Sequence, residues 1–103
     1  MIWNIENLNG YKPITTLWQD FSLAEQFDKG VQDTFKRAFK EWKTDYKYLT
    51  ELALVLNHKS WQHYKNGNKR VSNLYARLYE EVNDYAITTL KGNELTYYFN
   101  TTD

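Results

Sequence analysis

The sequence contains no cysteine, which excludes disulfides and thiolate metal sites. A chain of this kind is compatible with a reducing compartment, and we expect the protein in the cytoplasm. Only one proline and four glycines are present, so few positions interrupt regular structure. The length of 103 residues predicts one domain, residues 1–103, with a single modest core.

Long apolar runs are also absent. The longest, LALVL at residues 52–56, is far shorter than the ~20 residues that a membrane-spanning helix needs, so we expect no membrane partner. The first residues carry no basic segment followed by an apolar one, so no signal peptide is expected. Aromatic residues, by contrast, make up 17% of the chain, which favours a packed core over disorder.

The net charge is zero, but the charges are unevenly distributed. Residues 1–35 carry a net charge of −3, residues 36–77 carry +7 and residues 78–103 carry −4. No acidic residue occurs between Glu51 and Glu80. Either the basic middle folds against the acidic ends, or it forms a patch for an anionic partner. The zero net charge favours the first interpretation.

The first 30 residues predict a short arm and two short helices. The arm, residues 1–12, contains several apolar residues and is expected to pack on the core. Pro13 suits the first turn of a helix that ends near residue 20. The segment SLAE has the pattern of a capping box with Ser22 as N-cap, and Gly30 is expected to stop the helix that follows.

No glycine or proline occurs from Val31 to Asn66, and apolar residues recur there at helical spacing. The pattern fits either one helix of about 54 Å or two helices with a break near Thr44–Asp45. We predict the first, a continuous or slightly kinked helix over residues 31–65. Its second half is apolar nearly all round, which is typical of a helix central in a bundle or buried in an oligomer.

The segment NGN at residues 66–68 is the clearest turn in the sequence. Beyond it, an apolar stripe predicts a second helix over residues 69–91, antiparallel to the helix at 31–65. Residues 93–99 form either one more helical turn or an extended segment. The predicted fold class is all-α, a helical bundle built on this hairpin with the short N-terminal helices packing alongside.

Neither the histidines nor the acidic residues predict a metal site or an active site. His58 and His63 are five residues apart, about 140° around a helix, whereas two metal ligands from one helix need i,i+4 spacing. Glu80, Glu81 and Asp84 fit the solvated face of an amphipathic helix. The common nucleophile, phosphate-loop, dinucleotide and zinc-protease motifs are absent. We therefore predict no enzyme activity, no metal and no cofactor.

Two basic features are candidate binding sites for nucleic acid or for a protein partner. The first, the lysine stripe, forms one face if the long helix is continuous. The second, the hairpin tip, combines cations with aromatic rings and has no acid opposite it in the hairpin; a solvated tip is the alternative. The stripe comprises Lys36, Lys40, Lys43 and Lys47, and the tip comprises Lys59, Trp61, Tyr64, Lys65, Lys69 and Arg70.

Three segments resemble a family of small uncharacterised proteins of gut-bacterial prophages and mobile elements. They are EWKTDYKYLTELALVLNHKSWQHY (41–64), LYARLYEEVNDYA (74–86) and LKGNELTYYFNTTD (90–103). The family has no assigned catalytic residues to carry over. Some small proteins of this origin inhibit host defence nucleases, including Cas9-type nucleases. The resemblance therefore implies an anti-CRISPR type of activity.

Three functions stay open on the sequence alone. The first is a non-enzymatic interaction protein, a phage-type inhibitor that binds a Cas9-type nuclease or its guide RNA complex. Mimicry of DNA by acidic residues does not fit, because the middle of the chain is basic. The second is a helical nucleic-acid-binding protein that uses the hairpin tip. The third is a homodimeric structural or assembly protein that buries the apolar helix between subunits.

Overall fold

The computed structural model describes the backbone of residues 12–102 and the side chains of residues 16–102. Within that part of the chain all regular structure is helical, which confirms the predicted all-α class. The predicted arm lies outside the described residues, apart from Lys12, which begins the first helix. The helices are α1 (Lys12–Ala24), α2 (Asp28–Trp42), α3 (Tyr46–Lys65), α4 (Lys69–Thr89) and α5 (Asn93–Thr102).

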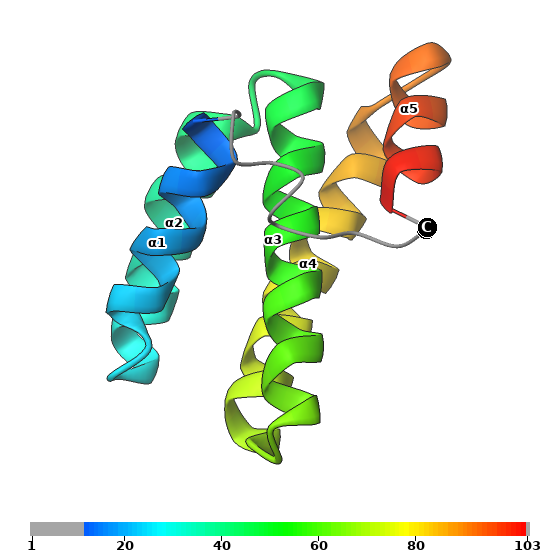
Figure 1. Ribbon diagram of the computed structural model, residues 1–103. Helices are drawn as coiled ribbons and strands as arrows, with labels where there is room; N and C mark the ends of the chain where they lie inside the picture. The colour runs from blue at the N-terminus through cyan, green and yellow to red at the C-terminus, as the bar shows by residue number, and fades with distance from the viewer. Residues whose placement is uncertain (1–11, 103) are drawn as a thin grey trace.

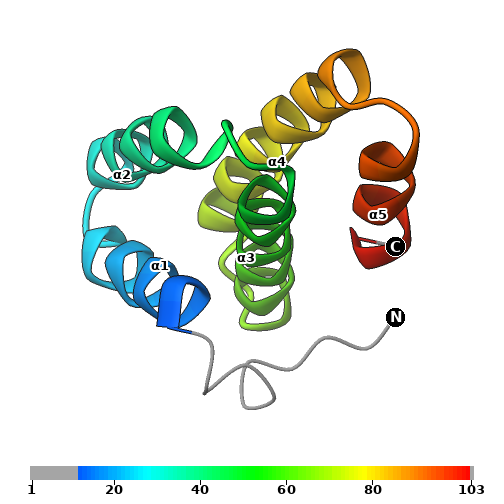
Figure 2. The same cartoon turned by 90° about the horizontal axis from the view of Figure 1, so that it is seen from above.

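Helix α3 is the centre of the bundle. Helix α4 runs back along it and forms the most extensive helix–helix interface. Helices α1 and α2 lie on one side of the α3–α4 pair and α5 lies on the other (Figures 1 and 2). This central position explains the apolar surface of α3, where Leu49, Leu54 and Leu56 are all buried within one chain. The apolar character of this helix therefore gives no support to a homodimer.

The predicted continuous helix over residues 31–65 is wrong, and the alternative break near Thr44–Asp45 is confirmed. Asp45 has an extended backbone, with φ −127° and ψ 122°, and its carboxylate accepts a hydrogen bond from the Lys47 amide at 2.8 Å. Asp45 is thus the N-cap of α3. The chain reverses between α2 and α3, so that α2 packs beside α3 instead of extending it (Figure 1).

Helix α1 is a single helix where two short ones were expected. Ser22, predicted as an N-cap, lies inside α1, and its hydroxyl donates a hydrogen bond to the Trp18 carbonyl at 2.9 Å. A serine whose hydroxyl bonds one turn back is tolerated within a helix, so the capping-box prediction is wrong. Gly30, predicted as a helix stop, lies in the first turn of α2 instead.

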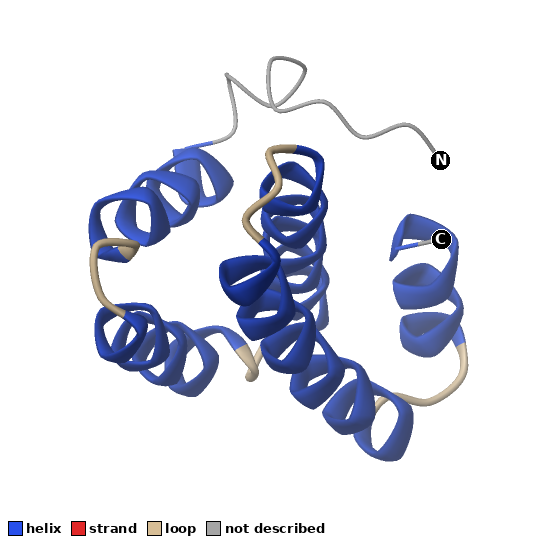
Figure 3. Cartoon of the chain, turned by 90° about the horizontal axis from the view of Figure 1, so that it is seen from below, coloured by secondary structure: helices blue, strands red, loops and turns tan. Residues whose placement is uncertain are grey.

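The position of Gly30 is explained by the close approach of α1 and α2. A Cβ atom at this residue would lie 2.8 Å from the carbonyl oxygen of Ala24, the last residue of α1. Atoms at that separation overlap, and a backbone carbonyl has little freedom to move aside. Glycine therefore permits the tight connection between the two helices, which Figure 3 shows from below.

We expect Gly30→Ala to destabilise the protein by about 1–3 kcal/mol, because the added methyl group overlaps the Ala24 carbonyl. Alanine has the higher helix propensity, by about 1 kcal/mol, so the sign of the change shows which effect dominates. Urea unfolding followed by circular dichroism measures it. The matched control is Lys29→Ala at the exposed neighbouring position. A more stable Gly30→Ala protein contradicts the close approach.

The turn between α3 and α4 is confirmed at residues 66–68. Gly67 has a φ of +80°, a left-handed conformation that glycine adopts without steric cost. Residues 93–99, for which two conformations stayed open, belong to helix α5. Tyr98 of α5 is fully buried, and the rings of Tyr97 and Tyr46 meet edge-on with centroids 5.3 Å apart. These contacts hold α5 against α3.

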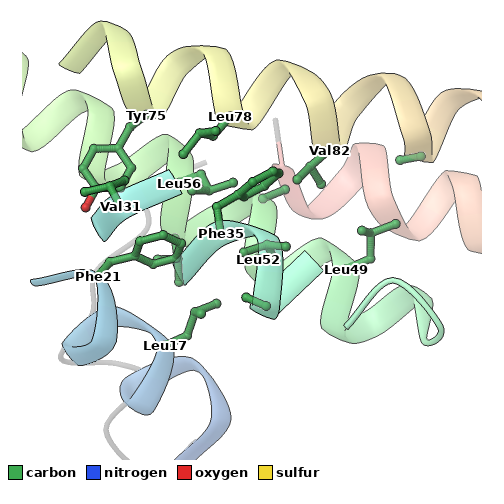
Figure 4. Packing of buried hydrophobic residues seen from close by; sticks show 14 of the residues in the cluster. Leu17, Phe21, Val31, Phe35, Leu49, Leu52, Leu56, Tyr75, Leu78 and Val82 are labelled. Atoms are coloured by element: carbon green, nitrogen blue, oxygen red, sulfur yellow. The ribbon is translucent and has the colours of Figure 1, made fainter. Parts of the chain in front are cut away.

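The hydrophobic core receives side chains from all five helices, and Figure 4 shows those of the first four helices converging. Phe21 of α1 meets Tyr75 of α4 edge-to-face, with ring centroids 5.7 Å apart. Phe39 of α2 meets Tyr85 of α4 in the same way at 5.3 Å. Aromatic pairs thus join α1 and α2 to the hairpin. Among the described helices, none combines the length and the apolar composition that crossing a membrane requires.

Candidate functional site

The lysine stripe is divided between two helices and does not form one helical face. The break at Asp45 places its last member on α3 and the others on α2 or at its C-terminal end. The ammonium group of Lys43 lies 5.8 Å from the Phe39 ring centroid and 5.9 Å from that of Tyr85. The ammonium group thus lies over the contact between α2 and α4. All four side chains of the stripe are exposed, namely Lys36, Lys40, Lys43 and Lys47.

Lys59 does not lie on the surface of the tip, because its side chain is only 2% exposed. Its ammonium group forms an ion pair with Glu25 at 2.9 Å and donates a hydrogen bond to the Ser22 hydroxyl. It also lies 4.1 Å from the ring centroid of Trp18, within the range of a cation–π interaction. These partners lie on α1 or directly after it, so Lys59 joins α1 to α3.

Glu25 receives side chains from two further positions. The Tyr75 hydroxyl of α4 donates a hydrogen bond to Glu25 Oε1 at 2.7 Å. His63 Nε2 of α3 lies 3.2 Å from the same oxygen, and its ring stacks on Tyr75 with an interplanar angle of 10°. One carboxylate thus links the end of α1 to both helices of the hairpin. We call Glu25, Lys59, His63 and Tyr75 the Glu25 cluster.

Burial and hydrogen bonding shift the pKa values in the Glu25 cluster. Burial raises the pKa of Glu25, but the contacts with Lys59, Tyr75 and His63 together outweigh it and hold the pKa below the ordinary value of 4.5. Burial lowers the pKa of Lys59, against the opposing effect of Glu25. Burial and the Glu25 carboxylate both raise the pKa of Tyr75. Glu25 is therefore ionised at neutral pH, and Tyr75 is a neutral hydrogen-bond donor.

The Glu25 cluster contains an acid, an amine, an imidazole and a phenol, which are the residue types of acid–base catalysis. Their contacts join the end of α1 to α3 and α4, and the Lys59 side chain is buried between these helices. We therefore interpret the cluster as a polar anchor between helices. In the part of the chain that the structure describes, no group of three or more histidine or acidic residues is arranged to hold a metal ion.

The exposed part of the hairpin tip is built from the last turns of α3 and the first turn of α4. Trp61 and Tyr64 are 57% and 58% exposed, and their rings meet edge-on with centroids 5.8 Å apart. Their i,i+3 spacing places them side by side on α3. Lys65 ends α3, Lys69 begins α4 and both are exposed. We call these four residues the tip surface.

The acidic first third of the chain neutralises part of the tip. Arg70, the remaining predicted contact residue, forms an ion pair with Asp28 at the start of α2. No carboxylate of the described residues pairs with Lys65 or Lys69. The acidic partners of Lys59 and Arg70 lie outside the hairpin, in residues 1–35, and the net charge of −3 in that segment is the sequence signal for them.

The structure therefore divides the predicted tip into an internal part and an external part. The internal part, Lys59 with the Glu25 cluster, positions helices. The external part, the tip surface, presents two aromatic rings and two cations to solvent. Comparisons with models of protein families, with curated proteins and with solved structures found no match.

Proposed function

We propose that this protein is a non-enzymatic interaction protein that binds a macromolecular partner through its tip surface. The observation that carries the proposal is the exposure of Trp61 and Tyr64, each more than half exposed, in a chain that fully buries Tyr75 and Tyr98. Exposed tryptophan and tyrosine are enriched among the residues that dominate binding energy at protein interfaces. Both residues lie on a regular helix, so little backbone conformational freedom is lost when a partner binds.

For the partner, we propose a host defence nuclease of the Cas9 type or its guide RNA complex. The protein would then be an inhibitor of phage or mobile-element origin. This part of the proposal rests on the resemblance of residues 41–64, 74–86 and 90–103. The first of these segments contains both aromatic residues of the tip surface. Such a target places the protein in the cytoplasm, which agrees with a chain that has no cysteine.

A cleavage assay with purified Cas9-type nucleases and the purified protein tests the proposal. We expect inhibition by the unaltered protein, and a loss of at least about tenfold in potency for Trp61→Ala or Tyr64→Ala, because each removes an exposed aromatic anchor. Leu23→Ala is the matched control, since Leu23 is an exposed apolar residue outside the tip surface. Unchanged cutting of DNA across several orthologous nucleases contradicts the nuclease target. Equal loss in the control contradicts the tip surface.

A second candidate function is nucleic-acid binding, favoured by the two exposed lysines beside the exposed rings. Bases stack on aromatic side chains, and lysines contact phosphates. Fluorescence anisotropy of labelled single-stranded and duplex nucleic acid, at low and near-physiological salt, tests it. Charge reversal at Lys65 and Lys69 is expected to abolish binding without unfolding, whereas Lys40→Glu on α2 should preserve it. No binding at low salt, or no effect of the reversals, contradicts this function.

A further inference from the structure

A groove between α1 and α2 forms a second candidate binding surface, separate from the tip surface. Its volume is about 800 Å³, within the roughly 300–1,000 Å³ that is common for ligand sites. Buried residues, among them Leu17 of α1 and Ala38 of α2, line its base. The groove extends to the break between α2 and α3, where the rings of Trp42 and Tyr48 lie with centroids 5.4 Å apart.

The charged residues that line the groove are mostly acidic. Asp20 of α1, Glu41 of α2 and Asp45 before α3 contribute three carboxylates, and Arg37 contributes the one cation among the described lining residues. The described lining residues therefore carry an excess of two negative charges. Asp20 and Glu41 are exposed, and neither forms an ion pair with a described residue. An apolar base, an aromatic end and an acidic rim thus occur together.

We propose that this groove binds a basic segment of a protein partner, one in which arginine or lysine alternates with apolar residues. The aliphatic part of a basic side chain matches the base formed by Leu17 and Ala38. Its charged head reaches the carboxylates of the rim or the faces of Trp42 and Tyr48, where cations are attracted to aromatic rings. This site is independent of the tip surface and of the partner proposed for it.

The charge of the groove argues against other occupants. An acidic segment is repelled by the rim, and so is the backbone of a nucleic acid. A wholly apolar segment removes water from the carboxylates without replacing their hydrogen bonds, which is unfavourable. A basic segment offers hydrogen-bond donors to the carboxylates while covering the apolar base. Charge complementarity therefore selects a basic protein segment.

The test uses a fluorescein-labelled peptide of alternating arginine and leucine, with a peptide of alternating glutamate and leucine for comparison. Anisotropy is measured with the full chain at near-physiological salt. We expect the arginine peptide alone to bind. Asp20→Asn combined with Glu41→Gln is expected to weaken binding about tenfold, because two rim carboxylates lose their charge. Tyr48→Ala, at the exposed aromatic end, is expected to weaken binding severalfold.

Two control variants test whether the peptide binds in this groove and not elsewhere on the protein. Glu80→Gln combined with Glu81→Gln makes the same change in net charge on exposed residues of α4 and should alter the affinity less than about twofold. Trp61→Ala removes part of the tip surface and should leave peptide binding unchanged, so this inference and the proposed function can fail separately. Absence of binding, or equal weakening by the α4 variant, overturns the proposal.

Discussion

Replacing Glu25 with leucine (Glu25→Leu) is expected to destabilise the protein by about 3–5 kcal/mol, because a buried ammonium group loses its counter-charge. Lys59 is 2% exposed and so has little access to water. The same substitution removes the acceptor of the hydrogen bond from the buried Tyr75 hydroxyl. An unpaired donor of this kind adds to the loss. Urea unfolding, followed by circular dichroism, measures the free energy of unfolding.

A double-mutant cycle of Glu25→Leu and Lys59→Met measures the interaction energy between the two side chains apart from what each contributes alone. Lys59→Met is expected to cost less than Glu25→Leu, about 1–2 kcal/mol, because Glu25 is 20% exposed and keeps water and Tyr75 as partners. The double variant should regain much of the stability, since apolar side chains replace a buried ion pair well. If the effects of the two single substitutions on stability simply add, the side chains of Glu25 and Lys59 are not coupled.

Arg70→Met breaks an exposed ion pair and should change the stability by less than about 1 kcal/mol.

The same carboxylate predicts a pH dependence with a definite sign. The pKa of Glu25 in the folded protein lies below 4.5, the ordinary value that applies to the unfolded chain. A group with a lowered folded pKa stabilises the protein above its unfolded pKa, and this contribution is lost as the pH falls through the folded pKa. The difference in stability between the unaltered protein and Glu25→Gln should therefore shrink below about pH 4.5. A difference that persists unchanged to acidic pH contradicts the lowered pKa.

The hairpin of α3 and α4 was predictable because its signals are local. The NGN turn and the apolar stripe that follows it define the start and the inner face of α4. The break at Asp45 was foreseen only as an alternative, since apolar spacing continues across it. Whether Asp45 caps a new helix or remains inside a long one depends on the packing of α2 against α3 and α4. Periodicity does not contain that information.

The candidate sites show the same limit. Trp61 and Lys65 are exposed, as a contact surface at the hairpin tip requires, and the acid-free stretch of the sequence was the basis of that prediction. Lys59 is four residues C-terminal to Val55 and shares its buried face. Because lysine is a polar residue, the apolar pattern of α3 did not predict that Lys59 is buried. Its burial depends on Glu25, a residue far away in the sequence. Helical spacing shows which residues share a face, and it does not show what packs against that face.

Phe21→Ala is expected to destabilise the protein by about 3–5 kcal/mol, because it removes a fully buried ring from the junction of α1 and α4. The matched control on the same helix is Leu23→Ala, whose side chain is 78% exposed and whose loss should change stability by less than about 0.5 kcal/mol. Phe21→Leu, which leaves a smaller cavity, should fall between the two. Urea unfolding of the three variants measures the order.

Amide hydrogen exchange shows whether the loss at Phe21 is local or global. Phe21 and the contacts of Lys59 with Ser22 and Glu25 are among the contacts that join α1 to the rest, and we expect these two attachments to support one another. If they act together, Phe21→Ala accelerates exchange in α1 and α3 alike. Faster exchange in α1 alone would mean that α1 detaches as a separate unit. Because α1 forms one wall of the groove between α1 and α2, detachment of α1 would also abolish the binding of basic peptides while the tip surface stays intact.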